Sequence, residues 1–405
     1  FFTKQRIIRM VEQNINDTKL CVLPFMHLAT HPNGVVTPCC QSDMTNGFSF
    51  SKDENLNILG KETLEQISNS SNFCNIRKQM INGEQPKECE GCYKLEETNT
   101  VSKRQYENEK YKLTVNDLTD LVDENGKLKK INYRFIELRL GNVCNLKCLT
   151  CNPMSSTKWN EDVEHLPEKF QSGYYTIDKS FSSWYKDKEW YDELLKNSDD
   201  LEEIYINGGE PMIIKEHIYF LEKLCEMGKS KNINLLYSIN LTIISDKIIE
   251  LWGKFKSVEL NVSIDDLGVR NDYIRFPSKF EVIEDNLNKL VGKGLNIKIV
   301  QTISVLNVHN IVNFYNHYTE KGFKIEHNYV NWPEYLHASL LPEKLINEIE
   351  VHQLPDDKSN RLLNELSKDY RIFNDDFIEY IKSIDKIRNI NIGNYLKEFV
   401  YLNIF

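Results

Sequence analysis

The chain has 405 residues, of which 40% are hydrophobic and 27% charged, a balance typical of a soluble globular protein. This length allows two or three domains with sizeable cores. No run of 18 apolar residues occurs, so we expect no membrane span. The net charge of −10 disfavours nucleic acid and anionic lipid as partners, because phosphate contacts require Lys and Arg.

Ten cysteines in a chain of this length do not indicate a secreted disulfide scaffold. Seven of them fall into two groups with ligand-like spacing, which favours metal clusters in a reducing, cytoplasmic compartment. The N-terminal residues lack the apolar core and cleavage site of a signal peptide, in agreement with that expectation. Cys74 and Cys225 stand apart in helix-like runs and are expected to be buried small side chains.

The N-terminal part predicts a short helix over residues 4–14, followed by a hairpin. An apolar run meets the turn dipeptide Asn33-Gly34, and the return run ends at Cys39 and its neighbour Cys40. A hairpin with this turn brings Cys21 and Cys39 towards each other near its base.

A helix is expected next, over residues 73–81, before a loop marked by Pro and Gly that carries Cys89 and Cys92. With Cys21 and Cys39, this part of the chain offers four thiolates from three separate places. Four cysteines suit either a structural zinc ion or an iron–sulfur cluster. Residues 94–131 are highly charged, give little structural signal and are interpreted as a link.

From residue 133 strands and helices alternate, which predicts a parallel sheet with right-handed crossovers. The expected strands are 133–140, 201–207, 233–240, 258–265, 296–305 and 324–331. The expected helices are 213–227, 245–255, 307–321 and one that begins at the capping box Ser278 to Glu281 and stops near Gly292.

Two further segments carry no assigned chemistry. The insertion 152–200 is interpreted equally as a lid or substrate platform and as a packed satellite; its aromatic residues are Trp159, Tyr174, Tyr175, Trp184, Trp190 and Tyr191. The C-terminal segment predicts a helix that starts at Asp375 and Asp376. Its apolar stripe is expected to pack in the core and consists of Phe377, Ile381, Ile384 and Ile387.

The first of these strands leads directly into the triplet Cys144, Cys148 and Cys151, spaced Cys-x-x-x-Cys-x-x-Cys. Three close thiolates can hold three corners of a cubane iron–sulfur cluster and leave the fourth iron open for chemistry. The alternative is a structural zinc site, but such sites usually pair two Cys-x-x-Cys units, and no second pair lies close downstream.

Polar residues follow the other strands at their carboxyl ends, where function gathers in parallel α/β folds. The second strand ends in Gly208, Gly209 and Glu210, so the backbone can approach a ligand closely and a carboxylate can pair with an ammonium group. The third ends in Ser238, Ile239 and Asn240.

The fourth strand has one polar face and one apolar face, and its polar face comprises Glu259, Asn261, Ser263 and Asp265. Because a packed barrel core would carry branched apolar residues, this face suggests a site. Arg275 follows the strand, and the sixth strand carries His327, which is expected to be a satisfied structural residue.

The cysteine triplet together with Gly208-Gly209-Glu210 resembles the radical S-adenosylmethionine (SAM) superfamily. The resemblance implies a six-stranded partial barrel and a 4Fe-4S cluster on Cys144, Cys148 and Cys151 that binds SAM and cleaves it to a 5′-deoxyadenosyl radical. It also implies roles in binding SAM. Glu210 would bind its amino group, the backbone of Thr150 its adenine, Ser263 and Asp265 the region of its ribose, and Arg275 its carboxylate.

The N-terminal cysteines resemble the SPASM and twitch domains that hold auxiliary clusters in radical SAM enzymes. The pattern runs from Cys21 through Gly34 and Cys39 to Cys89 and Cys92, and it fits the twitch type, with one auxiliary 4Fe-4S cluster. Such domains usually follow the barrel, whereas here the cysteines precede it. The spacing from Gly34 favours Cys39 as the ligand, with Cys40 as the alternative, and a structural zinc site is the competing interpretation.

The sequence therefore predicts an α/β protein with a partial (β/α)6 TIM-like barrel over residues 132–335. An N-terminal auxiliary-cluster domain with its linker is expected over 1–131 and a C-terminal helical segment over 336–405. The resemblance implies a radical SAM enzyme that acts on a small metabolite or a short peptide, with the auxiliary cluster in electron transfer and a reducing partner such as flavodoxin or ferredoxin. The alternative is a non-catalytic, cysteine-rich zinc or SAM-binding protein.

Overall fold

The computed structural model describes residues 15–42, 59, 62–171 and 183–402. The predicted helix over 4–14, together with Tyr174 and Tyr175, lies outside the described residues. The chain forms two compact units. Unit 1 comprises Phe1–Gly141, Ser180–Ile206 and Glu216–Leu235, and unit 2 comprises Asn142–Lys179, Asn207–Lys215 and Leu236–Phe405.

The fold is of the predicted α/β class. The strands follow the order β2-β1-β3-β4-β5-β6-β7-β8 in the sheet. Each expected strand from residue 133 onward is present, with bounds β3 (Phe135–Arg139), β4 (Glu203–Asn207), β5 (Asn234–Ile239), β6 (Ser257–Ser263), β7 (Asn296–Ile303) and β8 (Lys324–Tyr329). The expected count of six is exceeded by the two strands of the N-terminal hairpin.

The hairpin supplies β1 (His27–Thr30) and β2 (Val36–Thr37), which pair antiparallel as the Asn33-Gly34 turn predicted. Strand β1 also pairs in parallel with β3, with His27 opposite Phe135. A hairpin leaves one edge of each strand unpaired, and here the edge of β1 joins the strand that precedes the cysteine triplet. The start of the apolar run is not part of the strand, since residues 23–26 form the short helix α2.

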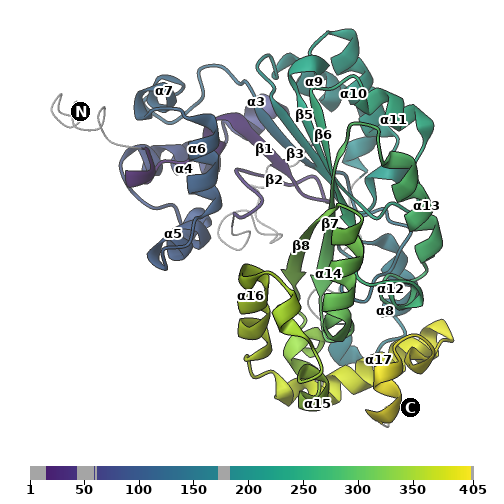
Figure 1. The fold of residues 1–405 in the computed structure, drawn as a ribbon. Helices are drawn as coiled ribbons and strands as arrows, with labels where there is room; N and C mark the ends of the chain where they lie inside the picture. Colours follow the sequence, from purple (N-terminus) through teal and green to yellow (C-terminus); the bar gives the residue numbers. More distant parts are fainter. Residues whose placement is uncertain (1–14, 43–58, 60–61, 172–182, 403–405) are drawn as a thin grey trace. The chain divides into compact units, whose positions relative to one another are not determined.

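The remaining elements of unit 1 are mainly helical (Figure 1). In chain order they are η1 (Ile15–Asp17), α2 (Leu23–Met26), α3 (Leu64–Ser68), α4 (Ser71–Ile81), η2 (Lys87–Cys89), α5 (Glu90–Glu97), α6 (Lys103–Tyr111), α7 (Val115–Asp120), η6 (Trp184–Lys186), α9 (Lys188–Lys196), α10 (Glu216–Glu226) and η8 (Ser230–Asn232), where η marks a 3-10 helix.

Two expectations for unit 1 are corrected. Cys89 and Cys92 lie on helical turns, not in a loop, because Pro86 is compatible with a helix start and opens η2. The charged link contains α6 and α7. Each begins with a capping box, formed by Ser102 with Gln105 and by Thr114 with Asp117.

Unit 2 contains the second half of the α/β repeat and the C-terminal helices. Its elements besides the strands are η3 (Thr157–Trp159), α8 (Asn160–Val163), η4 (Glu168–Phe170), η7 (Pro211–Ile213), α11 (Asp246–Trp252), α12 (Val269–Ile274), α13 (Phe280–Leu290), η9 (Val308–Asn310), α14 (Ile311–Glu320), η10 (Glu334–Leu336), η11 (Ala338–Leu340), α15 (Glu343–Ile346), η12 (Val351–Gln353), α16 (Asp356–Leu366), η13 (Arg371–Phe373), α17 (Asn374–Arg388), η14 (Ile392–Asn394) and η15 (Lys397–Leu402). Strand β7 pairs in parallel with both β6 and β8.

The predicted capping box of α13 is wrong. The helix has no side-chain cap from Ser278, whose hydroxyl is buried without a partner among the described residues. Instead Asp272, on the preceding helix α12, accepts a hydrogen bond of 2.6 Å from the amide of Phe280. A carboxylate brought from the neighbouring helix thus satisfies the helix start.

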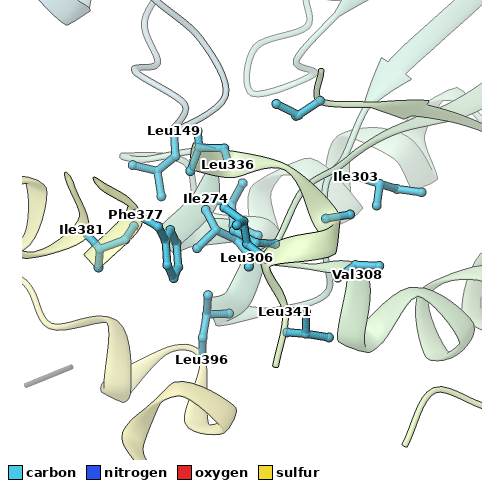
Figure 2. Close-up of a cluster of buried hydrophobic side chains, with 14 of the residues drawn as sticks. Leu149, Ile274, Ile303, Leu306, Val308, Leu336, Leu341, Phe377, Ile381 and Leu396 are labelled. Carbon is cyan, nitrogen blue, oxygen red and sulfur yellow. The ribbon is translucent and has the colours of Figure 1, made fainter. Parts of the chain in front are cut away.

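The core of unit 2 joins the barrel helices to the C-terminal segment (Figure 2). Helix α17 is confirmed as a core helix, because Phe377, Ile381 and Ile384 are buried in this cluster. The described aromatic residues of the insertion are buried as well: Trp159, Trp184, Trp190 and Tyr191. They therefore pack as in the satellite interpretation. Among the described residues, none of the helices has the length and apolar character that crossing a membrane requires.

Candidate functional site

The loop of Cys144, Cys148 and Cys151 is fixed by side chains that hold its carbonyl groups one by one. Ser156 donates to the carbonyl of Leu146, and Arg388 donates to that of Lys147 at 2.7 Å. Trp159 donates to the carbonyl of Cys148 at 3.0 Å, and Tyr380 to that of Leu149 at 3.3 Å. The loop thus has four consecutive carbonyls bonded to side chains outside it.

Two of its amides are bonded to the main chain at and just after the end of α12. Lys147 donates to the carbonyl of Phe276 at 2.7 Å, and Leu149 to that of Ile274 at 2.8 Å. The polypeptide between the first and third cysteines is therefore held from both sides.

A buried charge network lies behind the loop. Asp162 is 2% exposed and accepts from Lys147 at 2.6 Å and from the Nε of Arg388 at 2.7 Å. The Arg388 guanidinium also lies over the rings of Trp159 and Phe276, at 5.1 Å from each centroid. Removing one partner of such a buried network leaves a charge without compensation.

The Gly208-Gly209-Glu210 turn lies directly against the cysteine loop. Gly208 has a φ of +97°, which favours glycine. A Cβ on Gly209 would lie 2.1 Å from the carbonyl oxygen of Val143, so only glycine fits beneath that peptide. The same carbonyl accepts a hydrogen bond from the amide of Glu210 at 2.8 Å.

The Glu210 carboxylate is buried and held by two backbone amides, from Met212 at 3.1 Å and from Asn240 at 2.6 Å. Burial raises the pKa of Glu210 to about 7, while these two hydrogen bonds act in the opposite direction. The side chain of Asn240 then donates to Asn145 at 2.9 Å. Asn145 lies between the first two cysteines, so Asn240 connects the carboxylate to the cysteine loop.

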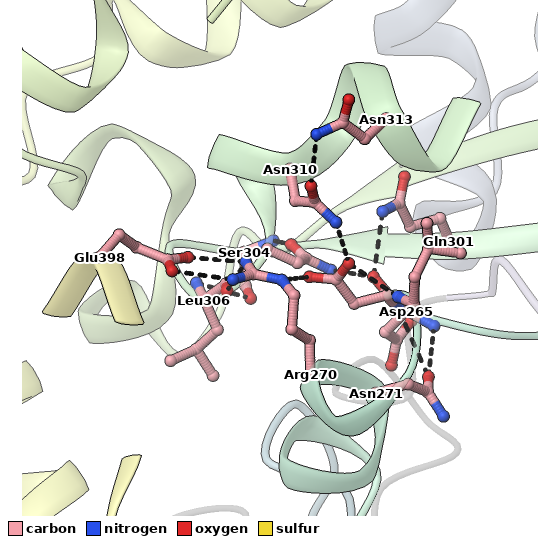
Figure 3. A network of polar contacts seen from close by, with 12 residues as sticks. Asp265, Arg270, Asn271, Gln301, Ser304, Leu306, Asn310, Asn313 and Glu398 are labelled. Carbon is pink, nitrogen blue, oxygen red and sulfur yellow. Dashed lines mark hydrogen bonds and ion pairs between the residues drawn. The ribbon is translucent and has the colours of Figure 1, made fainter. Parts of the chain in front are cut away.

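Asp265 and Arg275 form a buried ion pair of 3.0 Å at the end of β6. The second oxygen of Asp265 accepts from the amide of Thr302, and its carbonyl accepts from Gln301 and Asn307 (Figure 3). Both carboxylate oxygens thus have protein donors, and Asp265 orients Arg275.

Arg275 itself is only 9% exposed, and its Nε has no partner among the described residues. Burial would lower its pKa, but the neighbouring Cys148 and Asp265 outweigh burial and raise it. A buried cation with a free N–H beside the cysteines is suited to an anionic group bound there.

The next residue, Asp266, belongs to the same network, because the side-chain oxygen of Asn271 accepts from the amides of both Asp265 and Asp266 (Figure 3). It pairs with Arg270 at 2.7 Å, and Arg270 makes two further bonds, of 2.8 and 2.7 Å, to Glu398. Asn310 donates to the other oxygen of Asp266 at 2.6 Å. This network attaches η15 to the barrel and takes Asp266 out of consideration as an acid–base residue.

The three thiols lie near enough to one another to influence each other's pKa. Burial raises the pKa of Cys148 to about 11, and that of Cys151 is raised by burial and then by Cys148 and Cys144. Because thiolates are the metal ligands, loading of a cluster releases protons here. Within the described ranges no three His, Cys, Asp or Glu side chains surround a single metal ion.

In unit 1 the four expected auxiliary ligands, Cys21, Cys39, Cys89 and Cys92, line one small cavity. Burial raises the pKa of Cys21 to about 12. Burial also raises that of Cys89, and nearby Cys21 and Cys92 add to the effect. Cys40 does not line this cavity; its thiol faces Cys39, Glu137 and Lys103, and the hydrogen bond with Cys39 lowers its pKa.

Helix α6 holds the peptide around Cys21. Asn108 accepts from the amide of Val22 at 3.0 Å and donates to the carbonyl of Leu20 at 3.0 Å. Arg104 donates to the same carbonyl at 2.8 Å, and it pairs with Glu96 at 2.7 Å. Sequence reasoning missed both residues, because the segment that contains them gave little structural signal.

The other predicted site residues are placed as follows. Thr150, Ser238 and Ser263 are half-buried, the last on the polar face of β6, as its alternation predicted. Glu137 and Arg139 of β3 form an ion pair of 3.6 Å. The residues that sequence reasoning missed in unit 2 are Asp162, which pairs with Lys147 from the nearby helix α8, and Arg388 and Tyr380, which act on the loop from far along the chain.

Comparison with known proteins agrees with these two sets of cysteines. A family model of the radical SAM superfamily matches residues 138–319, and one of an iron–sulfur cluster-binding domain, SPASM, matches residues 21–93. No curated protein sequence matches the chain.

Among solved structures, the chain is similar to native anSMEcpe with bound AdoMet. The identity is 16% over 48% of this chain and 50% of that chain, and the TM-score is 0.35. It is also similar to Streptococcus suis SuiB bound to the precursor peptide SuiA, at 17% identity over 81% of this chain and 63% of that chain, with a TM-score of 0.36. The chain thus spans about half the length of the first of these structures.

The α/β repeat with the cysteine triplet is thus the part of the chain that matches the radical SAM superfamily. The part that matches a SPASM-type cluster-binding domain lies on its N-terminal side. These domains imply a SAM-binding 4Fe-4S cluster and an auxiliary iron–sulfur cluster.

Proposed function

We propose that this chain is an enzyme that cleaves SAM reductively and abstracts hydrogen from a small metabolite or a short peptide. One contact carries the proposal: the carbonyl before Cys144 accepts the amide of Glu210, with Gly209 packed beneath it. A cysteine loop that leaves one iron open and a buried carboxylate suited to an ammonium group therefore meet at the ends of neighbouring strands.

In this proposal Cys144, Cys148 and Cys151 hold the cluster, Glu210 binds the amino group of SAM and Arg275 its carboxylate. Asp265 orients Arg275. The rest of the SAM site comprises Thr150, Gly208, Gly209, Ser238, Asn240 and Ser263. When bound, the cluster supplies the electron that breaks SAM into methionine and the 5′-deoxyadenosyl radical.

We assign Cys21, Cys39, Cys89 and Cys92 to the auxiliary 4Fe-4S cluster. Four thiolate ligands leave no iron open for a substrate, so this cluster serves in electron transfer. A flavodoxin or a ferredoxin is the proposed reducing partner. A cytoplasmic location fits such clusters, because thiols stay reduced there.

The test is anaerobic reconstitution with iron and sulfide, followed by measurement of bound metal and of 5′-deoxyadenosine formed under dithionite. About eight irons per chain and formation of deoxyadenosine support the proposal. Cys144→Ala should lose about four irons and all cleavage. Cys225→Ala, which changes a cysteine of α10 outside both sets, should keep both.

Two other results would each remove part of the proposal. About four irons with intact cleavage would mean that the N-terminal cysteines hold no cubane. Zinc without iron, and no cleavage, would establish the non-catalytic zinc or SAM-binding alternative.

A further inference from the structure

Unit 2 contains a cavity of about 250 Å³, lined by residues of strands β7 and β8 and of helix α16. Strand β8 and helix α16 are labelled in Figure 1. The cavity is lined by Lys298, Lys324, Ile325, Glu326, His327, Tyr329, Asp357, Lys358 and Arg361. None of these residues belongs to the candidate site, and the sequence suggested no role for the cavity.

Two buried polar side chains point to a ligand in this cavity. His327 is 4% exposed and Tyr329 is 9% exposed, and alternation along β8 places both on the strand's buried face. Within the described part of the chain, neither ring nitrogen of His327 makes a hydrogen bond, and the Tyr329 hydroxyl has no hydrogen-bond partner. Buried polar groups are nearly always hydrogen-bonded in native proteins, so these groups call for a polar ligand or a water in the cavity.

The charge around the cavity favours an anion. Four lining residues are cationic and two are carboxylates, Glu326 and Asp357. Lys298 is already paired with Glu259 at 2.6 Å, and Lys358 donates to the carbonyl of Ile325 at 3.0 Å.

Of the two remaining cations, Lys324 and Arg361, Arg361 is the one placed beside a buried polar group. It makes no ion pair with any residue that the structure describes, is exposed to solvent and lies over the ring of Tyr329 at 5.0 Å. This position brings a planar guanidinium, which can bind an oxyanion with two N–H groups, beside the buried hydroxyl.

We propose that this cavity binds a small anion, carrying a carboxylate or a phosphate group, through Arg361 and the buried side chains of His327 and Tyr329. Burial, with help from Lys358 and Arg361, lowers the pKa of His327 to about 3, so its ring is neutral and offers one N–H donor. The volume is below that of most drug-sized sites and suits a compact ligand. The proposal does not depend on the SAM chemistry.

The test is isothermal titration calorimetry, which measures the affinity of the full chain for inorganic phosphate. The chain is purified anaerobically and the ionic strength is held constant. The variant Arg361→Gln should bind phosphate at least tenfold more weakly. Arg371→Gln is the matched control, because Arg371 lies on η13, is exposed and does not line this cavity. It should bind phosphate as the unmodified chain does.

Tyr329→Phe provides a second reading, since it removes only the hydroxyl and keeps the ring under Arg361. It should also weaken binding. Competition with acetate separates the two ligand chemistries: displacement of phosphate by acetate at similar concentration supports a carboxylate ligand, and failure to displace it supports a phosphate-bearing one. Absence of phosphate and acetate binding, or equal phosphate binding by Arg361→Gln and the unmodified chain, would overturn the proposal and leave a cavity filled with water.

Discussion

The two cysteine sets of this protein differ in how the chain brings their members together. In unit 2 the three cysteines lie close together in the sequence, on one loop after β3, and the fold supplies hydrogen bonds that hold the loop's peptide groups. In unit 1 the four cysteines come from three separate segments, and the fold brings them to one cavity. The first set is local and needs support, whereas the second exists only when its segments are assembled.

The support in each case comes from a helix without any cysteine of the set. Helix α17 contacts the loop of unit 2 through Arg388 and Tyr380. Helix α6 contacts the peptides beside Cys21 through Arg104 and Asn108. These two helices are therefore the places where one cluster can be disturbed and the other left intact.

The largest effect is expected from Arg388→Gln. The change removes one of the two buried cations that pair with Asp162, the other being Lys147. It also removes the hydrogen bond from Arg388 to the carbonyl of Lys147. Breaking a buried pair of this kind costs about 3–5 kcal/mol. We expect a lower free energy of unfolding in urea, with loss of about four of eight irons and of SAM cleavage.

Arg371→Gln is the control for Arg388→Gln, since its pair with Asp369 is exposed and should not affect stability or iron content. Full iron content and normal SAM cleavage in Arg388→Gln would show that the loop keeps its geometry without α17.

Asn108→Ala should instead disturb the auxiliary cluster and leave the SAM-binding cluster intact, with a smaller loss of stability than Arg388→Gln. The change removes the acceptor for the Val22 amide and one of the donors to the Leu20 carbonyl, in a buried position. Leaving one buried amide unpaired costs about 1–3 kcal/mol.

The measurement for Asn108→Ala is iron content together with the electron paramagnetic resonance of the reduced protein. We expect loss of the auxiliary signal while the signal that shifts on addition of SAM remains. Loss of the SAM-sensitive signal in Asn108→Ala would contradict the independence of the two cysteine sets.

The same contrast explains how far the sequence could be interpreted. The spacing of Cys144, Cys148 and Cys151 and the following Gly-Gly-Glu are local patterns, so the site was predictable without a fold. Arg388 lies more than two hundred residues from the loop, and its helix shows only the pattern of a core helix.

The wrong predictions have the same origin. The capping box at Ser278 was displaced by Asp272 from a neighbouring helix, and the pairing of β1 with β3 depends on contacts between distant segments. Local patterns indicated the candidate binding groups, whereas the groups that position them depend on the tertiary structure.

A third prediction concerns pH and applies to unit 2 alone. Burial raises the pKa of Glu210 to about 7, so its carboxyl is mostly neutral at pH 6 and mostly ionised at pH 8. Because an ammonium group pairs with the ionised form, SAM affinity should fall up to about tenfold between pH 8 and pH 6. Equilibrium binding of SAM to the anaerobic protein measures this, and Glu210→Gln should remove the pH dependence.

The stability of the SAM-free protein should change in the opposite direction. The folded pKa of Glu210 lies above the ordinary value of 4.5, so protonation stabilises the fold fully below pH 4.5, and this contribution is lost as pH rises through about 7. Urea unfolding of Glu210→Gln and of the unmodified chain across this range should show the difference. Parallel pH profiles of the two would mean that Glu210 is ionised throughout.

The smallest effect is expected from Cys40→Ser, which sharpens the comparison within unit 1. Cys39 lines the cavity with Cys21, Cys89 and Cys92, whereas the Cys40 thiol faces Glu137 and Lys103. Cys40→Ser should therefore keep about eight irons, and Cys39→Ser should keep about four with the SAM-sensitive signal intact. Loss of about four irons in Cys40→Ser, with full iron content in Cys39→Ser, would make Cys40 the ligand. The backbone after β2 would then have to rearrange on cluster loading so that Cys40 takes the place of Cys39 at the cavity.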